Sequence, residues 1–128
     1  MGAELITIPA HEDAELDRSR IQLLRQSLGD ERCREVVSEV VFHLTDRLGL
    51  LQGALGDGDL AEAQALAQRL ASLSEQVGLS DFSRIARDLA GCLAAGDATA
   101  TAAVSARLAR VGEDSLLSVI VFTDHTAL

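Results

Sequence analysis

The amino-acid sequence predicts an all-α fold, an up-and-down four-helix bundle preceded by a short extra helix. Apolar residues recur at intervals of three and four over several segments, which is the spacing of one buried helix face. Glycine-aspartate pairs interrupt these segments, as expected for tight turns between helices. Hydrophobic residues make up 48% of the 128 residues but aromatic residues only 2%, so the core must be aliphatic. A chain of this length is expected to form one domain.

Five helices are expected in order along the chain. A short helix covers about residues 17–28, and a long one follows over residues 31–55. The third and fourth are expected at residues 60–77 and 80–95, and an alanine-rich fifth helix at residues 98–111. Each is expected to end at a glycine, and these breaks are Gly29, Gly56, Gly58, Gly78, Gly96 and Gly112. Because the links are short, neighbouring helices should be antiparallel.

The two ends of the chain differ from the middle. Leu5-Ile6-Thr7-Ile8 and the stretch 119–123 are rich in β-branched residues and lack a helical stripe. They are expected either to pair as a small two-stranded ribbon or to form tails. In the second case the C-terminal stretch could lie over the bundle as an extended tail or add a last helical turn. The sequence therefore divides into an N-terminal extended segment (1–14), the bundle (15–112) and a C-terminal apolar tail (113–128).

Composition excludes several classes of function. Twenty acidic residues against eleven basic ones give a net charge of -9, which disfavours binding to nucleic acids and to anionic membranes. Cys33 and Cys92 form no paired motif, and both are expected to be small buried residues. No catalytic, metal-binding or cofactor-binding signature is present, so neither a metal nor a cofactor is expected. The absence of a long apolar run or signal segment predicts a cytoplasmic protein.

A more specific pattern lies in the third and fourth expected helices. Residues 66–93 read LAQRLASLSEQVGLSDFSRIARDLAGCL. This stretch resembles the histidine phosphotransfer (HPt) domain of bacterial phosphorelays, whose pattern is a small residue, the reactive histidine, any residue, leucine, lysine and glycine, followed by small residues, an aliphatic residue and glycine. The matching positions are Ala67, Leu70, Ser74, Val77, Gly78 and Leu89. The resemblance covers about residues 16–111 and implies the fold of that family.

Three departures from the family pattern decide what the resemblance implies about activity. Gln68 stands where the family carries its phospho-accepting histidine, Ala71 where lysine is usual, and Ser72 where glycine is usual. A neutral imidazole nitrogen attacks a phosphoryl group, whereas a carboxamide nitrogen does not. The resemblance therefore implies a signalling module that binds receiver domains or a histidine kinase as a decoy, scaffold or adaptor, and that is not an enzyme.

Helical spacing places a candidate binding surface around Gln68. Gln64, Gln68, Ala71 and Glu75 fall opposite the apolar stripe of the third expected helix, with Ser72 beside them. We expect these side chains to face solvent and to form a nearly flat patch. A solvated helix face without function would show the same pattern, so only the resemblance favours a partner-binding site.

Two other interpretations stay open at the level of sequence. His43 lies on the second expected helix at a height within about 5 Å of Gln68, so it could accept a phosphoryl group instead, although a packed structural histidine is the commoner case. Alternatively the chain is a structural or assembly protein that forms a homodimer through its C-terminal apolar tail.

Overall fold

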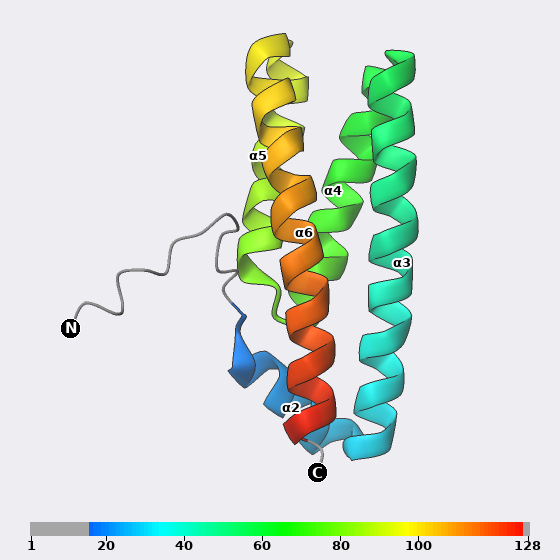
Figure 1. Cartoon of the computed structure of the whole chain (residues 1–128), viewed down its shortest axis with the longest axis vertical. Coiled ribbons are helices and arrows are strands. Elements are labelled where there is room, and N and C mark those ends of the chain that lie inside the picture. Colours follow the sequence, from blue (N-terminus) through cyan, green and yellow to red (C-terminus); the bar gives the residue numbers. More distant parts are fainter. Residues whose placement is uncertain (1–15, 127–128) are drawn as a thin grey trace, which may run out of the picture.

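The protein is an all-α bundle. The computed structural model describes residues 16–126, and the helices of this part are α2 (Arg18–Leu28), α3 (Asp30–Asp57), α4 (Leu60–Gln76), α5 (Ser80–Ala95) and α6 (Ala98–Thr126). Helices α3 to α6 run alternately up and down beside one another (Figure 1). The predicted fold class, a four-helix bundle with a short preceding helix, is confirmed.

Capping residues fix where the helices begin and end. Asp59 accepts a hydrogen bond from the backbone N–H of Glu62 at the start of α4, and Asp97 does the same for Ala100 at the start of α6. Gly58 and Gly96, with φ of 77° and 71°, end α3 and α5 in the left-handed conformation. The bundle therefore consists of two helical hairpins, α3–α4 and α5–α6, whose turns lie at the same end (Figure 1).

Helix α2 occupies the opposite end of the bundle. Helices α3 and α6 contain 28 and 29 residues, whereas α4 and α5 contain 17 and 16, so the longer pair extends beyond the shorter pair. Helix α2 packs in the space that this leaves (Figure 1), with Ile21 fully buried. The Asp17 N–H donates to the Gly78 carbonyl at 2.7 Å, which ties the start of α2 to the α4–α5 turn. A hydrogen bond from Ser19 lowers the pKa of the Asp17 carboxyl, which caps α2.

The prediction that the fifth helix ends at Gly112 is wrong. Helix α6 continues through that glycine to Thr126, so the predicted boundary between bundle and tail falls inside α6. A Cβ on Gly112 would lie 3.0 Å from Cε2 of Phe82 and 3.3 Å from Cδ2 of Leu48. Residue 112 is thus a glycine because α6 approaches its neighbours closely there, and not because a turn requires it.

The interpretation of residues 119–123 as a β-strand is also wrong. These residues are helical; Val119 is fully buried, and the Thr123 hydroxyl donates to its carbonyl. Packing of one side of α6 against the bundle overrides the strand propensity of β-branched residues. The other half of the expected ribbon, Leu5-Ile6-Thr7-Ile8, lies outside the described residues.

Candidate functional site: the groove between α4 and α5

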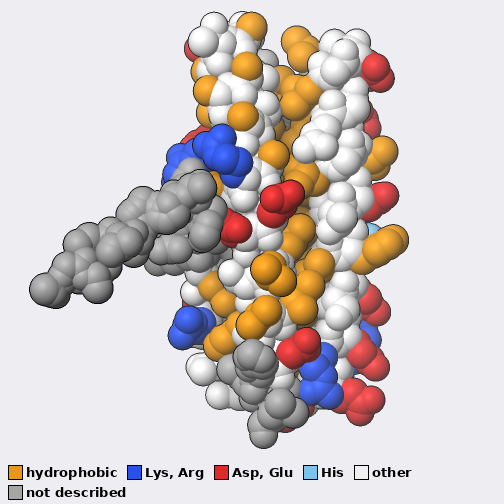
Figure 2. Space-filling view, in the orientation of Figure 1, with side chains coloured by type: hydrophobic (Ala, Val, Ile, Leu, Met, Phe, Trp, Pro, Cys, Tyr) orange, Lys and Arg blue, Asp and Glu red, His pale blue; other side chains and the backbone are white. Residues whose placement is uncertain are grey.

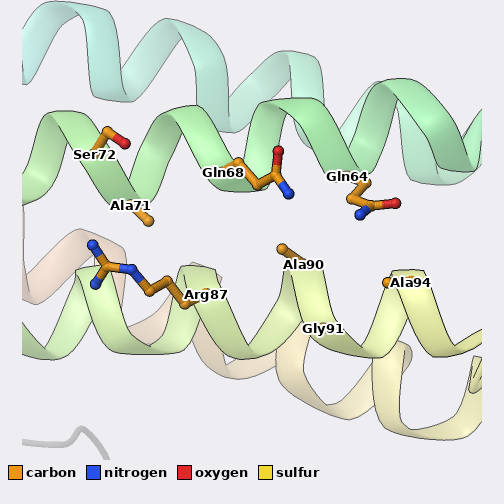
Figure 3. Close-up of a pocket in the computed structure, with 8 residues that line it drawn as sticks. All are labelled: Gln64, Gln68, Ala71, Ser72, Arg87, Ala90, Gly91 and Ala94. Atoms are coloured by element: carbon orange, nitrogen blue, oxygen red, sulfur yellow. The ribbon is translucent and has the colours of Figure 1, made fainter.

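Four of the five predicted binding residues line one open groove. Its α4 side consists of Gln64, Gln68, Ala71 and Ser72, and its α5 side consists of Arg87, Ala90, Gly91 and Ala94 (Figure 3). The volume is about 460 Å³. The groove exists because small residues line its floor, so that the two helices pack closely while longer side chains stand on the rim. We call this feature the α4–α5 groove.

The orientation of α4 places some of the predicted side chains in solvent and corrects the expected exposure of one. Gln68 and Ser72 are exposed, as the helical spacing predicted, and Gln64 is half-buried. Ala71 was expected to face solvent, but it is only 2% exposed. The reason is that α4 packs against both α3 and α5, so its buried face is wider than the single apolar stripe visible in the sequence. Ala71 contributes to the floor of the groove.

A polar network crosses from α4 to α5 at one end of the groove. The buried Ser83 hydroxyl donates to the Ala71 carbonyl at 3.1 Å, and Nη1 of Arg87 donates to the same hydroxyl at 2.7 Å. Nη2 of Arg87 also lies 2.6 Å from Oε1 of Glu75. Both charged side chains are about half exposed, with 51% and 53% of their surfaces accessible. A pair so solvated contributes at most about 1 kcal/mol, so its main effect is to hold the Arg87 guanidinium in place.

Glu75 lies beside the α4–α5 groove, not within it. Together with Arg87 it lines an adjacent polar depression of about 320 Å³, to which Arg20, Ser80 and Ser83 also contribute. The sequence pattern identified Glu75 but missed Arg87. No local signal links the two residues, because their contact spans the α4–α5 turn.

The groove offers binding groups but no strong nucleophile. Arg87 is the charged residue among those that line it, and the remaining polar groups are amides and a hydroxyl. The stretch 63–74 of α4 contains no carboxylate, although the chain carries twenty acidic residues. The residues that line the groove therefore carry no negative charge in a chain of net charge -9. This local charge favours an acidic partner surface over a basic one.

His43 does not belong to this groove. It lies on α3, whereas the groove is lined by α4 and α5. The expectation of a packed or half-buried histidine is wrong, because His43 is exposed and its ring meets the exposed Phe42 ring edge-on at 5.7 Å between centroids. Its use as a phosphoryl acceptor remains a hypothesis.

Residues 16–126 include both cysteines of the chain. Cys33 is buried as predicted, and burial raises the pKa of its thiol, which keeps it protonated; Cys92 is half-buried. No cluster of three or more His, Cys, Asp or Glu side chains suited to a metal ion occurs in this part of the chain. None of the helices described is both long enough and apolar enough to cross a membrane.

Part of the chain is similar to a known protein. A stretch of 67 residues, 52% of this chain, is 36% identical to part of the sensor histidine kinase AruS of Pseudomonas aeruginosa. The match spans only 7% of the length of that kinase. No protein-family model matches the chain, and no solved structure matches it. Part of this chain is thus similar to a short part of a sensor histidine kinase.

Proposed function

We propose that this chain is a binding module of two-component signalling. In this proposal the α4–α5 groove docks a receiver domain or a histidine kinase, and residue 68 carries no phosphoryl group. The observation that carries the proposal is that Gln68, Ala71 and Ser72, which the resemblance to HPt domains singles out, line one groove together with Gln64. The similarity of part of the chain to a sensor histidine kinase supports the same pathway.

The chemistry of Gln68 supports binding without phosphoryl transfer. Its amide nitrogen has no free lone pair for attack on phosphorus, but the amide can donate and accept hydrogen bonds at an exposed position. Ala71 provides no ammonium group to neutralise a phosphoryl oxygen. A partner bound here would be held and not modified, as in a decoy, a scaffold or an adaptor.

Substitution at the rim of the groove tests the proposed docking site. We expect Ser72→Arg to weaken binding of a receiver domain or kinase fragment from the same genome by about tenfold or more, because a long charged side chain would occupy the groove. Ala65→Arg is the matched control, since Ala65 is exposed on the same helix but does not line the groove. Titration calorimetry measures both. Equal affinities in the two variants, or no binding by the native chain at all, would refute the proposal.

A second candidate function is self-association, and exposed residues on α6 favour it. Three apolar side chains within one turn of α6 are exposed to solvent, namely Leu117 (63%), Ile120 (38%) and Val121 (43%). If the chain is an assembly protein, Leu117→Gln combined with Val121→Gln should convert a dimer to a monomer in sedimentation equilibrium. A native chain that is already monomeric at about 100 μM rules this candidate out, because an obligate dimer would form at that concentration.

A further inference from the structure

A second cleft lies at the end of the bundle where the two hairpin turns meet. It is lined by the last turns of α3 and α5 and the first turns of α4 and α6, among them Leu55, Leu60, Leu93, Ala98 and Ala102. Its volume is about 430 Å³, and it shares no lining residue with the α4–α5 groove. Figure 2 shows hydrophobic side chains between the two hairpins at this end. We call it the end cleft.

The end cleft has the chemistry of a receptor for an apolar side chain. None of its lining residues is titratable, and its hydroxyl groups are those of Thr101 and Ser105. The Ser105 hydroxyl is already hydrogen-bonded to the Ala102 carbonyl of its own helix. Leu60 remains 50% exposed at this site. An entering apolar group would remove such surface from water without leaving a charged group buried.

The residues that line the end cleft lie next to acidic residues but to no basic ones. The lining residues fall within residues 55–60 and 93–105. These stretches contain no arginine, lysine or histidine, and their acidic residues are Asp57, Asp59 and Asp97, with Glu62 two residues further along α4. All eleven arginines of the chain lie elsewhere, and the visible face in Figure 2 shows no basic side chain at this end.

Helix capping explains only part of this charge. Asp59 and Asp97 cap α4 and α6. Because asparagine would cap equally well, capping does not require the negative charge of these two side chains. Two helices begin and two end here, so the helix dipoles cancel in pairs. The aspartate and glutamate side chains therefore set the sign of the local potential, which is negative around an uncharged apolar cleft.

We propose that the end cleft docks a basic amphipathic helical segment of a partner protein. In this mode one apolar side chain of the segment enters the cleft, and flanking lysines or arginines lie against Asp57, Asp59 and Asp97. Apolar anchoring with complementary flanking charge is an established way for helical segments to be recognised. This site is independent of the α4–α5 groove, so the two could be occupied at once.

A synthetic peptide tests the chemistry of this site. The probe is a short amidated helical peptide with leucines along one face and lysines on both flanks, titrated into the full chain labelled with ¹⁵N. We expect saturable shifts of backbone amides at residues 55–60 and 96–105, which weaken as salt is raised. A peptide with glutamates in place of the lysines should not bind. Binding of both peptides alike, or shifts centred elsewhere, would overturn the proposal.

Two sets of variants make the test specific. Ala102→Phe fills the cleft and should weaken peptide binding by about tenfold or more, whereas Ala103→Phe, at the exposed neighbouring position outside the cleft, should leave it unchanged. Replacing Asp57, Asp59 and Asp97 together with asparagine keeps the caps and should cost about tenfold by removing three ion pairs. If the chain alone self-associates and Ala102→Phe abolishes this, the occupant is a second copy and the proposal fails.

Discussion

The Gln68→His variant is expected to accept a phosphoryl group that the native chain does not. Residue 68 is exposed on α4 at the α4–α5 groove, so an imidazole there would be accessible to a phosphorylated partner. Its neutral ring nitrogen supplies the nucleophile that the amide lacks. Incubation with a phosphorylated receiver domain should yield acid-labile phosphate at a level about tenfold or more above that of the native chain. Because Ala71 gives no lysine ammonium at this site, transfer should remain slower than in HPt domains that carry a lysine there.

Gln64→His provides the matched control for this prediction. Gln64 lies one helical turn earlier on α4 and lines the same groove, but it is half-buried and does not correspond to the reactive histidine of HPt domains. We expect it to acquire no acid-labile phosphate. If both histidine variants are labelled equally, proximity to the groove is sufficient and the register of the resemblance is wrong. If neither is labelled although the receiver domain binds, the docking geometry differs from that of HPt domains.

The second large effect is a loss of stability in Gly78→Ala. Gly78 has a φ of 78°, and a Cβ there would lie 2.5 Å from the carbonyl oxygen of Asp17. That oxygen is part of the backbone, so it cannot move aside as a flexible side chain would. The substitution would also disturb the hydrogen bond from the Asp17 N–H to the Gly78 carbonyl, which attaches α2 to the bundle. We expect the free energy of unfolding to fall by about 2–4 kcal/mol.

Gly96→Ala separates the cost of backbone conformation from the cost of the contact. Gly96 has a similar φ of 71°, but a Cβ there would meet nothing within 4 Å. Its substitution should cost only about 1 kcal/mol, the usual penalty for a left-handed alanine. Urea denaturation followed by circular dichroism measures both variants. Equal losses would mean that the contact between Asp17 and Gly78 does not contribute.

The sequence predicted the bundle well because helices and their breaks leave local signals. Gly58, Gly78 and Gly96 have positive φ and lie where turns were expected. Gly112 gives the same signal for another reason, because it allows α6 to pass close to Phe82. A single sequence does not distinguish a glycine required by conformation from one required by packing. The strand propensity of residues 119–123 likewise led to a wrong prediction, because the burial of Val119 against the bundle favours a helix there.

The candidate site was predictable only where it depends on one helix. Periodicity alone placed Gln68 and Ser72 on an exposed face of α4. It misplaced Ala71, because burial there results from α5 and not from the pattern of α4. Arg87 could not be inferred, since its contacts with Glu75 and Ser83 depend on how closely the two helices approach. The end cleft likewise combines four separate helix ends.

Labelled phosphate followed from a phosphorylated receiver domain to the native chain, with binding of the same receiver measured in parallel, tests whether the chain binds without being phosphorylated. We predict saturable binding that Ser72→Arg weakens, with no acid-labile phosphate on the native chain. Label that appears on the native chain and disappears in His43→Ala would contradict it, because the module would then transfer phosphate through α3.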